Sequence, residues 1–174
     1  LYVGLVYPIA GSWKWGGGFL QTLETPFYDF AGSTLVHSVG GWAALVAVWL
    51  LGARIGKFKN GKAQAIPGHN LPLATAGVLI LWLGWFGFNG GSQLAADGGA
   101  AMALTVTHIS AATASLSWAL WERIKYGKSS MVGMVTGTIA GLASITPASG
   151  SVGPAEALVI GAIAGILCQE ACGL

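Results

Sequence analysis

The residues best able to do chemistry in this sequence include an acid and a histidine within the small, apolar stretch DFAGSTLVHSVGG, residues 29–41. Asp29 directly precedes the apolar run, so its carboxylate suits the free N–H groups at the start of a helix. His37 lies about two turns deeper, where an ionisable side chain faces a bundle interior or an aqueous path. The residues alone leave two alternatives for His37, a core histidine with satisfied hydrogen bonds or a histidine of a transport path.

A second group combines aromatic rings with one hydroxyl. The segment WLGWFGFNGGS, residues 82–92, places four aromatic side chains, the last of them Phe88, ahead of Ser92. The segment WKWGGGFL, residues 13–20, adds two tryptophans, one of which is Trp15. Such rings are typical of the interface between membrane and water, but aromatic faces also bind cations. Together with the Ser92 hydroxyl they predict a receptor for a small monovalent cation.

The composition indicates that membrane-spanning helices must position these residues. Hydrophobic residues make up 54% of the chain and charged residues 8%, and the mean hydropathy is +0.68. Ordinary soluble domains carry roughly 25% charged residues, whereas the uncharged windows here are long enough for helices of about 20 residues. The sequence therefore predicts an all-α polytopic membrane protein with approximate spans at 1–11, 30–53, 72–93, 98–121, 130–147 and 154–171.

The basic residues predict the orientation of these spans. Seven of the eight, all but Lys14, gather in two loops that are separated by two spans: Arg54, Lys57, Lys59 and Lys62 in one, and Arg123, Lys125 and Lys128 in the other. Short loops rich in lysine and arginine stay on the cytoplasmic side, so the remaining connections face outward. The net charge of +2 is accordingly a topology signal. No basic run with interleaved aromatics stands in an exposed segment, and we expect no nucleic acid as a partner.

The two ends of the sequence indicate an internal piece of a longer protein. The chain does not open with methionine, and no basic segment or cleavage site of a secretory signal accompanies its first apolar run. We therefore treat residues 1–174 as a single transmembrane domain that is incomplete at both ends.

Three further segments have structural interpretations. GMVTGTIAG, residues 133–141, spaces glycines along one helix face, as in closely packed membrane helices. TPASGSVGP, residues 146–154, predicts an outer turn because it is rich in proline, glycine and serine. NGKAQAIPGHNLP, residues 60–72, predicts an inner loop that carries a solvated or capping His69.

Four motifs in this order and spacing, DFAGSTLVHSVGG, HNLP, WFGFNGGS and TPASG, resemble the ammonium transporter family, the Amt, Mep and Rh channels, in its microbial or plant-type Amt branch. The resemblance covers essentially the whole chain. It implies an eleven-helix subunit with its own pore in a homotrimer, of which these residues span the end of the fourth helix through most of the ninth.

The resemblance also implies roles for single residues. Trp15 matches the external aromatic residue of the ammonium recruitment site, and Ser92 matches the hydroxyl that accepts a hydrogen bond from the bound ion. Phe88 corresponds to one of two stacked phenyl rings that gate the pore. Asp29 matches a buried acid that orders the site, and His37 matches the first of two pore histidines. The second gating phenylalanine and the second histidine belong to the third and tenth helices of the family, outside this chain.

His108, in VTHISAATASLSWALW, is a tempting substitute for the second pore histidine. The family spacing puts it in the seventh helix, away from the pore pair. We expect a core histidine that is bonded to a neighbouring helix.

The implied function is ammonium transport for nitrogen uptake across the cell membrane, plasma or inner. The outer site recruits NH4+, the ion loses a proton at the constriction, and NH3 crosses a hydrophobic pore, with or without the proton. Deprotonation removes most of the desolvation cost that a bare cation meets in an apolar lumen, and imidazole can both accept and donate hydrogen bonds. The expected partners are ammonium or ammonia, the lipid bilayer, two further copies of the chain and a cytoplasmic regulatory protein. We expect no cofactor and no metal.

Two rival functions come from other classes. An ammonium sensor, or transceptor, would use the same outer site with little transport. A membrane enzyme is disfavoured, because the sequence has no paired intramembrane acids, metal-ligand cluster or nucleophile triad.

Overall fold

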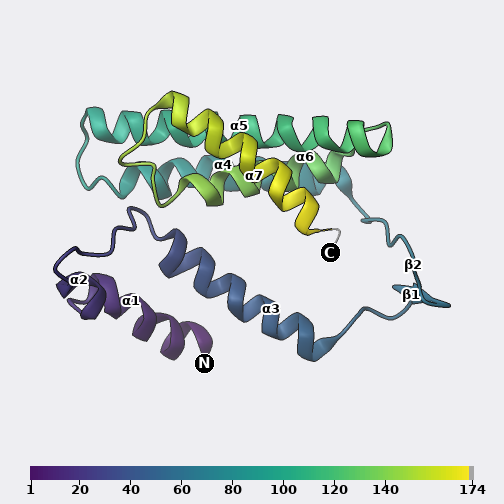
Figure 1. The fold of residues 1–174 in the computed structure, drawn as a ribbon, viewed down its shortest axis with the longest axis horizontal. Helices are drawn as coiled ribbons and strands as arrows, with labels where there is room; N and C mark the ends of the chain where they lie inside the picture. The colour runs from purple at the N-terminus through teal and green to yellow at the C-terminus, as the bar shows by residue number, and fades with distance from the viewer. Residues whose placement is uncertain (173–174) are drawn as a thin grey trace. The chain divides into compact units, whose positions relative to one another are not determined.

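The computed structural model describes residues 1–172, which form helices and one short hairpin (Figure 1). The chain divides into two compact units, one formed by residues 1–27 and 34–70 and the other by residues 28–33 and 71–174.

The first unit begins with a π-helical turn, Tyr2–Val6, that continues into α1 (Tyr7–Trp15). A glycine turn ends α1, because the backbone of Gly17 adopts a φ of 75°, which side chains disfavour. The short helix α2 (Phe19–Thr22) follows. The predicted apolar stretch 1–11 thus becomes helix, and the helix extends beyond it to Trp15.

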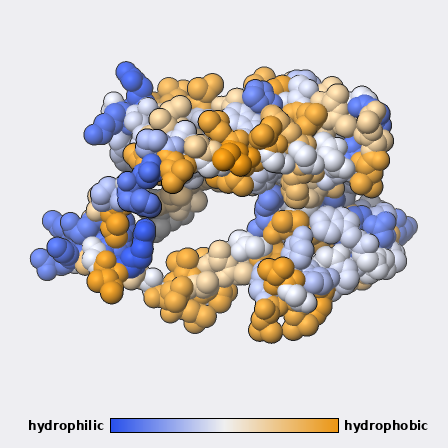
Figure 2. Space-filling view, turned by 180° about the vertical axis from the view of Figure 1, so that it is seen from behind, coloured by the Kyte–Doolittle hydropathy of each residue, from blue (hydrophilic) through white to orange (hydrophobic). Residues whose placement is uncertain are grey.

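The helix that carries His37 starts as a π-helix, Ser33–Ser38, and continues as α3 (Val39–Leu51). No residue of α3 is buried within this chain, and Trp49 is 82% exposed. Hydrophobic side chains likewise extend over much of the surface seen in Figure 2. A helix that is apolar all round requires lipid or other protein around it.

The loop after α3 contains a β-hairpin that the sequence analysis did not anticipate. Strands β1 (Phe58–Lys59) and β2 (Lys62–Ala63) pair in antiparallel orientation. Asn60 and Gly61 connect them with positive φ angles of 51° and 72°. Asn-Gly is the preferred sequence for this two-residue turn, because both residues tolerate the left-handed conformation. His69 lies exposed in the rest of this loop, as expected.

The second unit consists of α4 (Leu71–Gly91), α5 (Gly98–Tyr126), α6 (Met131–Ile145) and α7 (Pro154–Ala171). Helix α5 packs extensively on both α6 and α7, and α4 contacts α5 and α6. Asp97 caps α5 by accepting a hydrogen bond from the N–H of Ala100 at 3.1 Å. Ser130 caps α6 in the same way through the N–H of Gly133 at 2.9 Å.

Glycines allow these helices to approach closely. A Cβ atom on Gly137 would meet Trp118 and the carbonyl oxygen of Ala114, both in α5. Gly161 and Gly165 bring α7 against the same helix, where added side chains would meet Ser110 and Ala114. The predicted close packing of residues 133–141 is confirmed, since Gly133, Gly137 and Gly141 are all buried. Small residues on both sides of these contacts are typical of helix packing in membranes.

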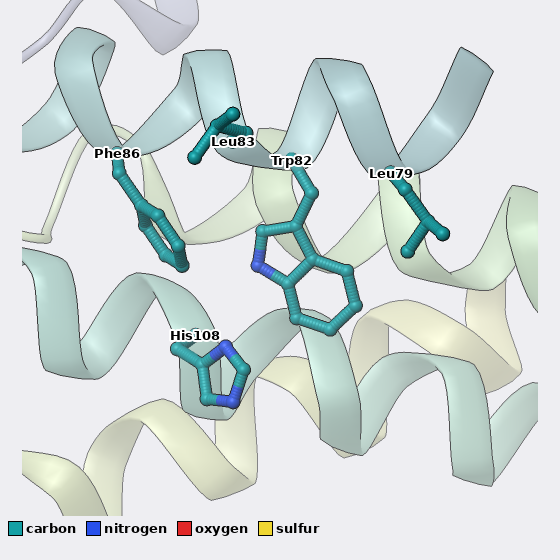
Figure 3. Close-up of a pocket in the computed structure, with 5 residues that line it drawn as sticks. All are labelled: Leu79, Trp82, Leu83, Phe86 and His108. Carbon is teal, nitrogen blue, oxygen red and sulfur yellow. The ribbon is translucent and has the colours of Figure 1, made fainter. Parts of the chain in front are cut away.

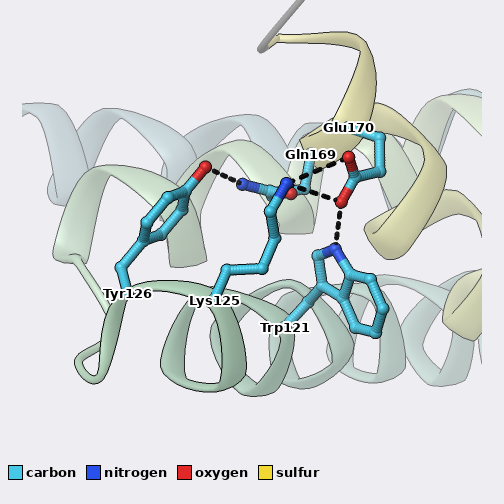
Figure 4. A network of polar contacts seen from close by, with 5 residues as sticks. All are labelled: Trp121, Lys125, Tyr126, Gln169 and Glu170. Carbon is cyan, nitrogen blue, oxygen red and sulfur yellow. Dashed lines mark hydrogen bonds and ion pairs between the residues drawn. The ribbon is translucent and has the colours of Figure 1, made fainter.

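A polar network joins the C-terminal ends of α5 and α7 (Figure 4). Lys125 Nζ lies 2.9 and 3.0 Å from the two carboxylate oxygens of Glu170, which also accepts a hydrogen bond from the indole of Trp121. Beside this pair, Gln169 donates to the hydroxyl of Tyr126 at 3.4 Å. Such partly exposed ion pairs stabilise a fold by about 0 to 1 kcal/mol. The network therefore links α5 to α7 but makes only a small contribution to the stability of the bundle.

Four helices of residues 1–172 are long and apolar enough to cross a membrane, namely Ser33–Leu51, Leu71–Gly91, Gly98–Tyr126 and Pro154–Ala171. Helix α6 is apolar but shorter. The predominantly helical, polytopic architecture predicted from the sequence is therefore present.

Candidate functional site

Ser92 lies immediately beyond the end of α4, where its hydroxyl has a defined direction. The Oγ atom is 2.7 Å from the carbonyl oxygen of Phe88. Because a carbonyl can only accept, the hydroxyl must donate its single proton to that oxygen. The remaining lone pairs of Ser92 can then only accept hydrogen bonds, which suits a ligand that donates them. The side chain is half-buried.

Phe88 is packed against a second aromatic ring of the same helix. Its ring centroid lies 5.9 Å from that of Trp85, with an angle of 75° between the planes. This edge-to-face geometry is favourable for aromatic pairs. The indole is fixed in turn by a hydrogen bond of 2.9 Å from its Nε1 atom to the hydroxyl of Thr146.

Asp29 is 3% exposed and organises a tight turn. Its Oδ1 atom accepts hydrogen bonds from the N–H groups of Gly32, at 3.0 Å, and Ser33, at 2.9 Å. The predicted capping interaction is confirmed, although the helix begins at Ser33 rather than near Phe30. A carboxylate that accepts backbone N–H groups ahead of a helix also offsets the positive end of the helix dipole.

The turn after α6 contacts both of these regions. The N–H of Phe30 donates to the carbonyl oxygen of Pro147 at 3.2 Å, and the Ser33 hydroxyl donates to that of Ala143 at 2.9 Å. Gly150 lies directly under the Phe30 ring, where a Cβ atom would collide with it. The segment that carries Asp29 and the α4 end that carries Phe88 and Ser92 therefore share one support, residues 143–150.

The other two predicted site residues belong to the first unit. Trp15 is the last residue of α1 and is 51% exposed. His37 is half-buried and lies in the π-helical segment Ser33–Ser38. Single π-helical turns are rare and occur frequently at functional sites. The structure thus brings Asp29, Phe88 and Ser92 into one unit and places Trp15 and His37 in the other.

Asn89 is a candidate that the sequence analysis missed. Its side chain is 0% exposed, and its Nδ2 atom donates to the hydroxyl of Thr107 at 2.8 Å. That hydroxyl donates to the carbonyl oxygen of Ala103 at 2.6 Å. The bond fixes the rotation of α4 against α5 directly beside Phe88. An amide inside an apolar span was the available signal, because buried polar groups need partners.

His108 corrects an expectation, since it is exposed rather than part of the core. It contacts the neighbouring helix as expected, but through ring contacts, with Trp82 at 5.1 Å and Phe86 at 6.0 Å between centroids. Figure 3 shows the rings of Trp82 and Phe86 pointing from α4 toward His108, with Leu79 and Leu83 beside them. These five side chains line a shallow apolar groove of about 250 Å³. This face of α4 and α5 is thus lined by apolar side chains and one imidazole.

Comparison with known proteins gives one consistent result. The profile described as the Ammonium Transporter Family matches residues 1–174. The chain is 46% identical over 171 residues to ammonium transporter Amt1 of Archaeoglobus fulgidus, covering 98% of this chain and 42% of that protein. It is 43% identical over 168 residues to an ammonium transporter of Bacillus subtilis, covering 97% of this chain and 40% of that protein. The chain therefore spans about two fifths of the length of these relatives.

Solved structures agree with these relatives. A structure described as a Sensor Amt Protein superimposes with a TM-score of 0.93 at 40% identity, covering 98% of this chain and 44% of that one. The crystal structure of Candida albicans Mep2 gives a TM-score of 0.88 at 36% identity, covering 97% of this chain and 37% of that one.

Proposed function

Because the chain belongs to the ammonium transporter family, we propose that the complete protein recruits NH4+ at an outer aromatic and hydroxyl site and conducts it as NH3 through a hydrophobic pore. The family resemblance and the polytopic membrane fold predicted from the sequence are confirmed by these relatives. The substrate, the mechanism and the residue roles are the content of the proposal.

The observation that carries the proposal is the hydrogen bond from Ser92 to the Phe88 carbonyl. Because this bond uses the hydroxyl proton, the Ser92 oxygen can only accept further hydrogen bonds at the proposed outer site. Ammonium donates hydrogen bonds in tetrahedral directions, and potassium donates none, although the two ions are similar in size and charge. A hydroxyl that can only accept hydrogen bonds, placed beside aromatic rings, therefore discriminates ammonium from potassium by hydrogen bonding and not by charge alone.

Trp15 adds the cation–π part of the recruitment site. Its indole is half exposed at the end of α1, so a cation arriving from water can reach the ring. Such contacts contribute about 0.5 to 2 kcal/mol, depending on desolvation. Asp29 supports the site without touching the ion, and its Oδ1 holds the turn ahead of the helix by accepting from the backbone of Gly32 and Ser33.

Phe88 gates the path below this site, and His37 lines the lumen beyond it. A bare cation in an apolar lumen pays a desolvation cost of several kcal/mol or more. Loss of a proton at the gate removes most of that cost. The imidazole of His37, which lies in the π-helical segment Ser33–Ser38, then exchanges hydrogen bonds with ammonia or relays the released proton.

The assembly expected for such a transporter completes the proposal. The complete protein forms a homotrimer in the cell membrane, each subunit with its own pore, and a cytoplasmic regulatory protein acts on it. Among the described residues the hydrophobic side chains of α3 remain at least partly exposed, which is consistent with burial by the remaining helices and by lipid.

The test uses the complete protein in proteoliposomes. Ammonium and potassium pulses of equal concentration are applied to wild type, Ser92→Ala and His37→Ala, and current and internal pH are recorded together. We expect a saturable ammonium response without a potassium response. Ser92→Ala should raise the half-saturating concentration, and His37→Ala should reduce the rate or admit potassium. Native behaviour of both variants would contradict the proposed roles.

An ammonium sensor is the second candidate, favoured by the high structural similarity to a Sensor Amt Protein. A sensor would bind ammonium at the same outer site and transport little. The same recording separates the two functions. Neither current nor a change of internal pH in the wild type, with ammonium binding retained, would favour sensing.

A further inference from the structure

We propose that Thr146 is a positioning residue for the Phe88 gate, acting through the indole of Trp85. This inference rests on the proposed function, because it assigns a support to the gate named there. Thr146 is the first residue of the motif TPASG, which the sequence predicts to lie in an outer turn and which is one of the four family motifs.

The threonine is a fixed point in the structure. It is 0% exposed, directly after the last residue of α6. Its hydroxyl donates to the carbonyl oxygen of Leu142 at 2.7 Å, which leaves its lone pairs to accept. The indole Nε1 of Trp85 occupies this acceptor at 2.9 Å. Because the Thr146 hydroxyl both donates and accepts a hydrogen bond, its orientation is fixed, and the bond that it accepts fixes the position of the Trp85 indole.

The turn that follows α6 is itself held in place. The N–H of Ala148 donates to the carbonyl oxygen of Ile145 at 3.0 Å, and Ser149, also 0% exposed, donates to that of Thr146 at 3.3 Å. The carbonyl oxygen of Pro147 accepts from Phe30. The acceptor offered to Trp85 is therefore part of a buried, hydrogen-bonded turn and not of a mobile loop.

The indole transmits this position to the gate. Trp85 and Phe88 are three residues apart on α4, so their side chains lie on the same helix face. With Nε1 anchored, the indole contacts the phenyl ring at 5.9 Å and 75°. The anchored neighbour limits the rotation available to the Phe88 ring. Without the anchor, the indole can turn and the phenyl ring gains alternative orientations.

The consequence is a separation of two kinetic quantities. Recruitment depends on Ser92, whose hydroxyl bonds to the Phe88 backbone and not to its ring. The rate of passage depends on the ring. Loss of the Thr146 hydroxyl should therefore change the maximal rate and the exclusion of potassium while leaving the apparent affinity for ammonium nearly unchanged.

The test compares variants of the complete protein in proteoliposomes. Thr146→Val removes the hydroxyl at nearly constant volume, and Thr146→Ser keeps it. The matched control is Thr136→Val, because Thr136 lies in α6, the helix that Thr146 directly follows, and its hydroxyl donates to the carbonyl oxygen of Val132 at 2.7 Å. Trp85→Phe removes the donor and keeps an aromatic ring beside Phe88.

We expect Thr146→Val to lower the maximal ammonium flux about fivefold, with a change of less than about twofold in half-saturating concentration, because small displacements of a positioned group are costly. Thr146→Ser and Thr136→Val should remain within about twofold of wild type. Combining Thr146→Val with Trp85→Phe should add little to either single change, since both remove the same hydrogen bond. Equal behaviour of Thr146→Val and Thr136→Val would overturn the inference.

A second readout does not depend on transport. The Raman band of indole that responds to N–H hydrogen bonding is compared between wild type and Thr146→Val. A shift in this band supports the bond from Trp85, and its absence overturns the positioning role. If Thr146→Val does not fold, Trp85→Phe and Thr146→Ser carry the kinetic comparison. A wild type that transports no ammonium overturns the proposed function and the gating role, whereas an active wild type with a normal Thr146→Val variant overturns only the present inference.

Discussion

Two connections of the second unit, both placed on the outer side by the sequence, differ sharply in their surroundings. Residues 146–153, between α6 and α7, bury Thr146 and Ser149 completely. Residues 92–97, between α4 and α5, leave Asp97 exposed and Leu94 93% exposed. Both are short and rich in small or polar residues. The difference teaches that a connection on the water side of a membrane protein can be core, and that the buried one supports the candidate site.

The largest expected contrast comes from adding a side chain to a glycine within the first connection and to one directly after the second, at the start of α5. Gly150→Val drives methyl groups into the Phe30 ring and should lower the free energy of unfolding by about 3 kcal/mol, the upper end of typical overpacking costs. Gly98→Val is the matched control, since a Cβ there meets no atom within 4 Å. Reversible denaturation of the complete protein in detergent measures both. Similar losses of unfolding free energy in the two variants would contradict the expected difference between the two connections.

The two acidic caps provide the next contrast. Asp29→Ala leaves two backbone N–H groups without their carboxylate in a buried turn and should cost about 2 kcal/mol. It should also reduce ammonium transport. Asp97→Ala removes an exposed cap and should cost less, with transport at the native rate. Unfolding and flux are measured on the same preparations, and an inactive Asp97→Ala variant would contradict this assignment.

A smaller effect is expected for a single neutral hydrogen bond. Ser33→Ala removes the donor to the Ala143 carbonyl and should lower the free energy of unfolding by about 1 kcal/mol. Ser151→Ala is the control, because that hydroxyl is exposed and bonds only within its own turn, to Ala148. Denaturation curves that coincide for the two variants would show that the shared support of the site contributes nothing.

The smallest effect is a pH dependence in the exposed connection. The N–H of Ala100 and then the side chain of Gln93 hold the pKa of Asp97 below its ordinary value of 3.8. A carboxylate with a lowered folded-state pKa stabilises the fold above the unfolded-state value, and this contribution disappears as the pH falls through the folded-state pKa. Wild type should therefore exceed Asp97→Asn in melting temperature near neutral pH, with the gap closing below about pH 4. A gap that persists at acidic pH would contradict the assignment.

Much of the architecture follows from the sequence, because long uncharged windows predict membrane-spanning helices and basic loops predict their orientation. The turn at 146–154 was predicted in place, and the glycines of α6 were correctly assigned to close packing. The hairpin at 58–63 was missed although its Asn-Gly turn was visible. The helix starts at Ser33 because its N–H donates to the side chain of Asp29. Hydropathy does not predict which backbone N–H a side chain will accept from.

The residue roles taken from the family stay predictions, and the contacts between the residues could not be read from the chain. The bonds from Trp85 to Thr146 and from Asn89 to Thr107 join different helices. Whether such side chains meet depends on the rotation of each helix about its axis, which close packing sets. His108 was misassigned for the same reason, since its exposure depends on which face of α5 the neighbouring helices cover.

The central position of α5 bears on how the protein is made. Its two most extensive partners, α6 and α7, both follow it in the chain. When α6 and α7 are synthesised, the surface of α5 on which their glycines pack has therefore already been made. These pairings involve only helices that are close in the sequence. Among the contacts of α5 with these two helices, the one between Lys125 and Glu170 forms after the others, because Glu170 lies near the end of α7. The packing of α6 and α7 on α5 can consequently follow the order in which these helices are synthesised.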